Sequence, residues 1–456
     1  MSDYIFSRVP QIVDKVSTKN RIIKTEIPCP GSERILSILD NYESRSMHGQ
    51  LPLVWDHAKD YNIYDSAGNK WIDFTSAIFF TNVGHSNNRV SKYLERVIQE
   101  KPLIGCYAYG NEIRAKYLKK LLEFAGSNFQ KAFLMSAGTE ATEAALKLMR
   151  MHGQKKLKKN LGIIAFEGNW HGRTMGAQMM SGNEMQKAWI GKLDEHIHHL
   201  PFPYHWDLNK RSGESFFYDS IKILQSKGID FKNDLCGMIL ETFQGWGAIF
   251  YPKDFVQAAE DFCRKNDLLL SFDEMQSGFA RTGMAFGYQH YDVNPDLLCC
   301  GKGMGNGYPL SGVIGKEEVM DLPEIGNMSS THSANPMACS AGLAVIEEIN
   351  NRNLIEEAKN KGMILHSKLN ELKEKSNNNI SYVYGKGLIA SIIFQDSSGN
   401  PNSALPSKVA EICMQKGLLV VHTGRESIKL GPPLTITNDA LIEGINVLSD
   451  VILDNI

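Results

Sequence analysis

The stretch LLSFDEMQSGFARTG (Leu269–Gly283) runs from a short apolar segment into two adjacent acids, Asp273 and Glu274. Other short apolar runs, separated by helical patterns, lie at Ala132–Met135, Gly162–Phe166, Gly237–Leu240 and Leu297–Cys300. Apolar runs buried on both faces are typical of parallel strands covered by helices. The sequence therefore predicts an α/β fold, with Asp273 at the carboxyl end of a strand, where such folds bind ligands.

The two ends of the chain show a different pattern. Near the N-terminus a helical stretch, Glu33–His48, precedes strand-like runs at Val54–Asp56, Asn62–Asp65 and Lys70–Phe74, which predict a β-meander. After Pro336 a helical pattern continues to about Lys375, and strand-like runs follow at Ile389–Phe394 and Leu418–Val421. We expect an N-terminal segment over 1–75, a large domain over 76–336 and a smaller α+β domain over 337–456.

Composition excludes several classes of protein. The chain has 456 residues, of which 43% are hydrophobic and 22% charged, as in an ordinary globular protein. The formal charge of -2 favours neither nucleic acid nor an anionic membrane as a partner. We expect no membrane span, and a cytoplasmic location, because no apolar run is long enough to cross a bilayer or to act as a secretion signal. The eight cysteines form no CxxC pair, which predicts reduced thiols and no metal.

Three motifs carry candidate chemistry. In SAGTEATEAALK (Ser136–Lys147), which follows an apolar run, Gly138 would let an anion approach the first N–H groups of a helix. Alone, this motif equally fits an ordinary capped helix. Asp273 could keep a heterocyclic nitrogen protonated, or could simply cap a loop. Lys302, in LCCGKGMGNGYPLSG (Leu298–Gly312), could be a nucleophilic amine or a solvated loop lysine.

The combination of these motifs is more specific than any one of them. A helix start that binds phosphate, an acid for a ring nitrogen and an amine for an aldehyde match the three functional groups of pyridoxal 5'-phosphate. The glycine-rich stretch around Lys302 fits neither the GxxxxGK[ST] nor the GxGxxG pattern, so nucleotide binding gains no support. The sequence therefore predicts a pyridoxal-phosphate site with Lys302 as its amine.

These motifs, in this order, resemble the class III (ω-amino acid) aminotransferases. The resemblance runs from the meander near Tyr64 and NVGH (Asn82–His85) to PPLTI (Pro432–Ile436). It implies fold type I: a mostly parallel seven-stranded sheet in a large domain, plus a smaller α+β domain built from both chain ends. It also implies a homodimer with active sites at the interface.

The resemblance assigns the cofactor contacts residue by residue. Lys302 would form the Schiff base and Asp273 would pair with the pyridine nitrogen. The phosphate would lie on Ser136, Gly138 and Thr139, and Thr331, from STHSANP (Ser330–Pro336), would reach the phosphate of the neighbouring subunit. The remaining cofactor contacts implied are the stacking Trp170 and its neighbour His171, the acid Glu241 from ETFQGWG (Glu241–Gly247), and Gln276 at the phenolic oxygen.

Substrate contacts follow in the same way. Arg173 matches an arginine that grips a substrate carboxylate, for which a guanidinium fork is suited; the alternative is a structural ion pair. Trp246 stands where a switching glutamate is usual, and Lys429 where an arginine for the α-carboxylate is usual, so Lys429 would act as a point charge. Phe79 and Phe80 fall in the substrate-wall segment, and with Trp246 they predict a broad aromatic pocket.

The predicted reaction is a ping-pong transfer of an amino group from an amine or ω-amino donor to a 2-keto acid, 2-oxoglutarate or pyruvate. Amino acids, diamines and amino sugars are candidate donors. The same scaffold also supports racemases, decarboxylases and aminomutases, which need no external keto acid, and a non-catalytic binding protein is a further alternative. EHIHH (Glu195–His199) is interpreted as a solvated surface segment rather than a metal site.

Overall fold

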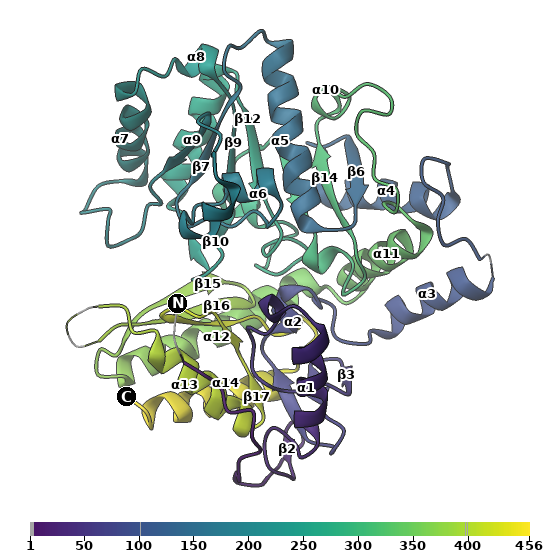
Figure 1. The fold of residues 1–456 in the computed structure, drawn as a ribbon, viewed down its shortest axis with the longest axis vertical. Coiled ribbons are helices and arrows are strands. Elements are labelled where there is room, and N and C mark those ends of the chain that lie inside the picture. Colours follow the sequence, from purple (N-terminus) through teal and green to yellow (C-terminus); the bar gives the residue numbers. More distant parts are fainter. Residues whose placement is uncertain (1–3, 101, 397, 399) are drawn as a thin grey trace. The chain divides into compact units, whose positions relative to one another are not determined.

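The computed structural model describes residues 4–100, 102–396, 398 and 400–456 (Figure 1). The chain divides into two compact units. One comprises Met1–Asn87, Trp246–Ala248 and Leu354–Ile456, and the other comprises Asn88–Gly245 and Ile249–Asn353. The predicted domain boundaries at 75/76 and 336/337 stay predictions.

The unit over 88–353 is built on a seven-stranded sheet with the order β6-β14-β13-β12-β9-β7-β8. Strand β14 is antiparallel to both of its neighbours, and the pairs from β13 to β8 are parallel. This confirms the expected mostly parallel sheet of seven strands. The strands, in sheet order, are Lys131–Met135, Ser311–Gly315, Leu297–Cys300, Leu269–Asp273, Leu235–Glu241, Gly162–Phe166 and Ile197–Leu200. A separate short hairpin joins β10 (Phe243–Gln244) to β11 (Ile249–Phe250).

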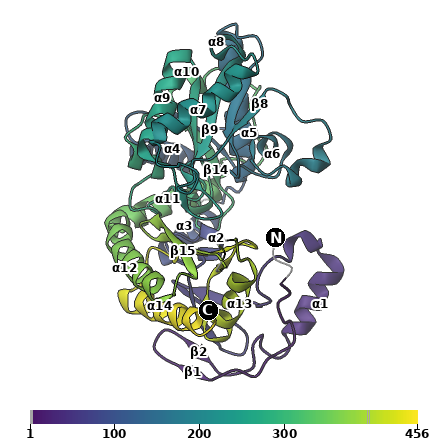
Figure 2. The ribbon, with the colours of Figure 1, turned by 90° about the vertical axis from the view of Figure 1, so that its left-hand side faces the viewer.

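Helices cover both faces of this sheet (Figure 2). On one face α5 packs against six of the seven strands, and on the other α9 contacts β12 and α7. Alanines on the buried side of α5, Ala141, Ala144 and Ala145, let this helix lie close to the strands. The helices of the unit are α3 (Asn88–Gln99), α4 (Glu112–Ala125), α5 (Gly138–Lys155), α6 (Met175–Met180), α7 (Gly213–Ser226), α8 (Phe231–Asp234), α9 (Lys253–Asn266), α10 (Glu317–Met320) and α11 (Pro336–Asn351), with 3-10 turns η2 (Met185–Ile190), η3 (Gly287–Tyr291) and η4 (Lys302–Met304).

The other unit is α+β and is made from both chain ends, as expected. One sheet has the order β1-β2-β5-β4-β3, with β17 paired to β5, and the second has the order β15-β16-β19-β18. The strands of the first are Val16–Ser17, Ile22–Ile23, Lys70–Asp73, Asn62–Tyr64, His57–Lys59 and, for β17, Leu418–Leu419. Those of the second are Ile380–Lys386, Ile389–Phe394, Ser427–Leu430 and Val421–His422. The helices are α1 (Ser32–Tyr42), α12 (Leu354–Lys375), α13 (Ala404–Gln415) and α14 (Asn438–Leu453), with a 3-10 turn η1 (Arg45–Met47).

A left-handed turn, α2 (Ser76–Phe79), follows β5. The φ angles of its four residues are 45, 50, 66 and 68°, a region that disfavours residues with a Cβ. Hydrogen bonds hold it in place: Thr75 donates N–H and O–H to Asp73, at 2.7 and 2.6 Å, and Ser76 Oγ donates to the Gly431 carbonyl at 2.6 Å. The turn carries Phe79, so the backbone at this predicted substrate contact is strained.

Three local predictions were wrong. Val54–Asp56 is not a strand, and the meander starts instead at His57. The segment interpreted as solvated around Glu195–His199 contains the edge strand β8, whose Ile197 and Leu200 face the core. The helical pattern after Pro336 breaks at Asn353, where φ is +50°, so two helices replace one. In the described part of the chain no helix combines the length and apolarity that crossing a bilayer requires.

Candidate active site

The carboxyl ends of three parallel strands bring the central residues of the site together. Asp273, the last residue of β12, is the register neighbour of Glu241 on β9 and of Cys299 on β13. Strand β13 ends at Cys300, and Lys302 begins the 3-10 turn η4 directly after it. The fold therefore gathers two acids and one amine at a single edge of the sheet.

Asp273 is buried and its carboxylate has two partners. Oδ2 lies 2.9 Å from Nδ1 of His171, and Oδ1 accepts the N–H of Met275 at 3.0 Å. A carboxylate accepts hydrogen bonds, so Nδ1 carries the proton. The imidazole is completely buried, and its Nε2 has no hydrogen-bond partner among the described residues. His171 thus orients Asp273 from one side.

Glu241 is the second buried acid. Its Oε2 accepts the N–H groups of Trp170 at 2.9 Å and of Gly245 at 3.3 Å. Burial, and then the charge of Asp273, raise the pKa of Glu241 to about 7. The amide of Gln276 lies close by, because a Cβ at Gly245 would be 2.5 Å from Gln276 Nε2 and 2.9 Å from Glu241 Oε1. Gly245 therefore leaves the space that these two side chains occupy.

The surroundings of Lys302 shift the pKa of its amine in opposite directions. Burial lowers the pKa of its amine, while the charges of Asp273 and Glu241 act in the opposite direction. A buried amine with a lowered pKa has more of the neutral form that attacks a carbonyl. Its φ of 32° falls in the left-handed region, a strain that is frequent at functional sites.

The start of α5 lies against the Lys302 loop. A Cβ on Gly138 would come within 2.8 Å of Met275 Sδ, and a Cβ on Gly301 within 2.6 Å of the same sulfur and 3.5 Å of the Gly138 Cα. The lack of a Cβ at both positions therefore leaves the room that the Met275 side chain occupies. The Glu140 carboxylate accepts the N–H groups of Ser136 and Ala137, at 2.9 and 2.7 Å.

The segment that contains Arg173 makes contacts with the Trp170 ring and with the first turn of α5. Its guanidinium carbon is 4.6 Å from the centre of the Trp170 ring, within the range of cation–π attraction. A Cβ on Gly172 would lie 2.3 Å from Thr139 Oγ1, and Thr139 Oγ1 is 2.6 Å from Thr174 Oγ1. The segment thus packs directly on the first turn of α5.

The four remaining substrate candidates lie in the unit made from both chain ends. Lys429 on β19 is buried, with its Nζ 4.3 Å from the centre of the Phe79 ring. The Phe80 N–H donates to the Ser76 carbonyl and closes the left-handed turn. The ring of Trp246 lies 3.8 Å from the guanidinium carbon of Arg425, and the Trp246 carbonyl accepts from Ser427 Oγ. Arg425 has no counterpart in the sequence prediction.

Thr331 is exposed in the turn that precedes α11, where the Ser333 N–H donates to the Ser330 carbonyl. No hydrogen bond between described residues joins Thr331 to the edge of the sheet. Its predicted contact with a neighbouring subunit stays a prediction.

Two glutamates near the site were not predicted from the sequence. Glu274 is fully buried and accepts four hydrogen bonds, from Thr242 Oγ1, Ser277 Oγ and the N–H groups of Gly287 and Tyr288. Burial raises the pKa of Glu274, and these donors offset part of the rise. The other is Glu143 on α5. An acid directly after a strand signals Glu274, whereas nothing local signals Glu143.

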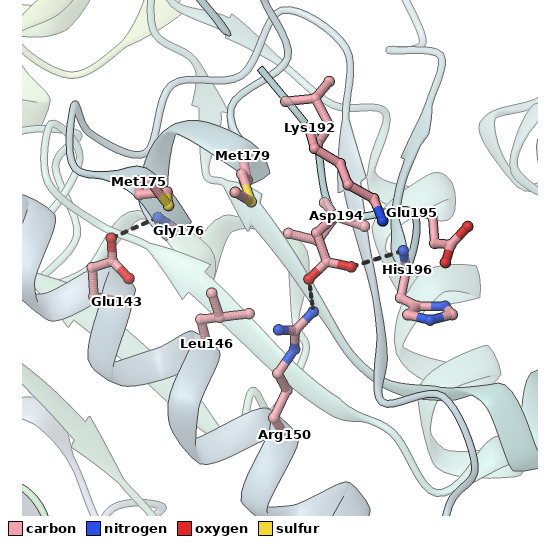
Figure 3. A pocket seen from close by; sticks show the side chains of 12 residues that line it. Glu143, Leu146, Arg150, Met175, Gly176, Met179, Lys192, Asp194, Glu195 and His196 are labelled. Carbon is pink, nitrogen blue, oxygen red and sulfur yellow. Dashed lines mark hydrogen bonds and ion pairs between the residues drawn. The ribbon is translucent and has the colours of Figure 1, made fainter. Parts of the chain in front are cut away.

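A cavity of about 550 Å³ lies elsewhere in this unit, beside α5, α6 and β8 (Figure 3). An ion pair between Arg150 and Asp194 spans it, and Glu143 stands at its edge. None of the predicted site residues lines it. The described residues also contain no group of three His, Cys, Asp or Glu that could hold a metal ion.

The residues at the edge of the sheet fit pyridoxal 5'-phosphate. Because Gly138 and Gly301 carry no Cβ, the start of α5 and the Lys302 loop lie against each other and against Met275. Glu140 accepts the N–H groups of Ser136 and Ala137. Gly138 and Thr139 are the first two residues of α5, where N–H groups have no acceptor within the helix, which suits a phosphate at a helix start. The buried carboxyl group of Asp273 suits a partner for a ring nitrogen, and burial lowers the pKa of the Lys302 amine.

Comparison with known proteins agrees with this geometry. Residues 43–452 match the family model described as Aminotransferase class-III. The acetylornithine aminotransferase, mitochondrial, of Candida glabrata is 31% identical over 86% of this chain and 88% of its own. The 4-aminobutyrate aminotransferase of Mycobacterium leprae is 30% identical over 96% and 99%. The ornithine aminotransferase of Toxoplasma gondii, solved with partial occupancy of PLP at its active site, matches with a TM-score of 0.79 and 25% identity over 92% and 94% of the two chains.

Proposed function

Because the chain belongs to the class III aminotransferases, which are pyridoxal-phosphate-dependent enzymes, we propose that it moves an amino group from an amine or ω-amino donor to a 2-keto acid, 2-oxoglutarate or pyruvate. Lys302 is the residue that holds the cofactor. The observation that carries this proposal is the Lys302 amine, whose pKa is lowered by burial, on the same sheet edge as Asp273 and Glu241. The names of the relatives, which include acetylornithine and 4-aminobutyrate aminotransferases, support a donor with an ω-amino group.

Each residue of the edge has a task in this proposal. The cofactor, when bound, supplies an aldehyde and a ring that withdraws electrons from the substrate carbon. Asp273, oriented by His171, keeps a proton on the ring nitrogen. The N–H groups at the start of α5 hold the phosphate, and Nζ of Lys302 carries a proton to and from the substrate carbon. The other proposed cofactor contacts are Ser136, Gly138, Thr139, Trp170, Glu241 and Gln276.

Substrate recognition is proposed from the resemblance. Arg173 takes a carboxylate of the donor through its guanidinium fork. Lys429 neutralises a carboxylate as a point charge, and the aromatic side chains of Phe79, Phe80 and Trp246 line the pocket. Amino acids, diamines and amino sugars fit such a pocket.

A homodimer completes the proposal. Thr331 of one subunit contacts the phosphate in the other, so each site needs both chains. Light scattering should give twice the chain mass, and a monomer with full activity would remove Thr331 from the site. A cytoplasmic location stays a prediction.

The test is to load the protein with pyridoxal 5'-phosphate, reduce it with borohydride and map the modified peptide by mass spectrometry. We expect the cofactor on Lys302, and its loss together with transamination in Lys302→Ala. Lys187 is the matched control, because burial also lowers the pKa of this lysine, and Lys187→Ala should keep the label on Lys302. A label that persists elsewhere in Lys302→Ala, with activity intact, would refute the proposal.

A further inference from the structure

Glu143 lies one helical turn after Thr139 on α5 and reaches across to the start of α6. Its Oε1 accepts the Gly176 N–H at 2.8 Å (Figure 3). The same oxygen accepts two further hydrogen bonds, from Thr174 Oγ1 at 2.7 Å and from the Ala177 N–H at 3.1 Å. Thr174, the residue before α6, makes no side-chain cap of its own. A glutamate from another helix therefore satisfies the first N–H groups of α6, which would otherwise lack acceptors.

Gly176 leaves the space into which the Glu143 carboxylate fits. A Cβ on Gly176 would lie 2.4 Å from Glu143 Oε2. Together with Gly172, whose Cβ would meet Thr139 Oγ1, it flanks the short stretch that contains Arg173. Both glycines let this stretch sit directly on α5.

The hydrogen bonds made by the hydroxyl groups of Thr174 and Thr139 each have a defined donor and acceptor. An ionised Glu143 only accepts hydrogen bonds, so Thr174 must donate its hydroxyl proton to it. Thr139 then donates to Thr174 Oγ1 across 2.6 Å, and the Thr174 N–H donates weakly to Thr139 at 3.3 Å. Thr174 is consequently held from two sides by residues one turn apart on α5.

From this arrangement we propose that Glu143 is a positioning residue for Arg173, which is the neighbour of Thr174. By fixing the backbone of 174–177, the Glu143 carboxylate keeps the guanidinium over Trp170, where it is ready for the carboxylate of an ω-amino acid. The inference rests on the proposed function of Arg173. It deepens that function because it makes selectivity for carboxylate-bearing donors depend on a residue that touches neither substrate nor cofactor.

The effect should be confined to donors that carry a carboxylate. Misplacing a binding group by about 1 Å costs on the order of a hundredfold in rate, so Glu143→Ala should lower kcat/KM for 4-aminobutyrate on the order of tenfold to a hundredfold. It should leave kcat/KM for n-butylamine, in which a methyl group replaces the carboxylate of 4-aminobutyrate, near that of the wild type. Cofactor affinity should not change, because the Glu143 carboxylate binds Thr174, Gly176 and Ala177 and not the N–H groups of Gly138 and Thr139 that are proposed to hold the phosphate.

The test compares Glu143→Ala, Arg173→Ala and the double variant, each loaded with cofactor, on these two donors. Ser212→Ala is the matched control, since it removes an N-terminal cap from α7 in the same unit, where Ser212 Oγ accepts the Ser215 N–H at 3.1 Å. This control should lose stability without any change in donor selectivity. If Glu143→Ala does not fold, Glu143→Gln, which keeps an acceptor oxygen but no charge, should show a smaller loss of the same kind.

The outcomes separate the inference from the function on which it rests. A selective loss in Glu143→Ala that does not add to that of Arg173→Ala supports the inference. Equal losses for both donors would mean that Glu143 only caps α6, and would overturn it. A selective loss in Arg173→Ala alone would overturn the inference and leave the proposed function intact, whereas no selective loss in Arg173→Ala would overturn the proposed role of Arg173 itself.

Discussion

Glu241→Gln should stabilise the cofactor-free protein at neutral pH and do little at low pH. Burial beside Asp273 raises the pKa of Glu241 from 4.5 to about 7. Between these values the folded protein retains a proton that the unfolded chain has released, so the free energy of unfolding falls as pH rises through this window. The penalty is complete above pH 7, and at 1.36 kcal/mol per pKa unit it amounts to about 3 kcal/mol.

The geometry makes glutamine a close replacement. Both backbone donors, from Trp170 and Gly245, bind the same oxygen of Glu241, so an amide oxygen can take over both hydrogen bonds while the titration disappears. Urea unfolding followed by tryptophan fluorescence, at pH values from 5 to 8, measures the difference in free energy of unfolding between the two proteins. It should grow by about 2.5 kcal/mol from pH 5 to pH 8, because part of the penalty is already present at pH 5. The exposed Glu195, as Glu195→Gln, is the control and should show no such growth. Parallel pH curves for wild type and Glu241→Gln would refute the reasoning.

Two further substitutions test the backbone and the buried hydrogen bonds. Ala77→Gly should raise the melting temperature, with a gain of about 1 kcal/mol in the free energy of unfolding, because Ala77 has φ 50° in the left-handed turn. The control, Ala144→Gly in the middle of α5, should lower the free energy of unfolding by about 1 kcal/mol. A loss of stability in both variants would contradict the strain at Ala77. Glu274→Gln should lower the free energy of unfolding by about 3 kcal/mol, because an amide has one acceptor oxygen for four donors and leaves two of them unsatisfied. Urea unfolding that shows no loss would mean that the donors find other acceptors.

The sheet was predictable where its strands are apolar throughout, and less so at its edges. The runs that became β7, β12 and β13 are buried along their whole length, so hydrophobicity alone identifies them. Strand β8 was missed because two histidines fill its centre, and only Ile197 and Leu200 at its ends are buried. The break at Asn353 was missed because it contains neither proline nor glycine.

The residues of the site likewise divide into those that the sequence predicts and those that it does not. Asp273 and Lys302 could be predicted because each follows an apolar strand, and the ends of parallel strands meet at one edge. Glu143 could not, because its three acceptor contacts reach residues 31 to 34 positions along the chain. Within its own helix it is indistinguishable from a solvated glutamate. Contacts of this kind come from how α5 and α6 pack, which no local pattern encodes.

The edge of the sheet also explains how two neighbouring acids come to differ. Glu241 and Asp273 are register neighbours on adjacent parallel strands, which brings the two acids to the same edge of the sheet. Asp273 has an imidazole N–H and a backbone N–H to support its charge, whereas Glu241 has two backbone N–H groups on a single oxygen. Burial, and then the charge of Asp273, raise the pKa of Glu241, and its two backbone N–H groups offset only part of that rise. The segment 170–171 contacts both acids, since the His171 imidazole binds Asp273 and the Trp170 N–H binds Glu241, so the two acids differ in their partners although they occupy equivalent places at two strand ends.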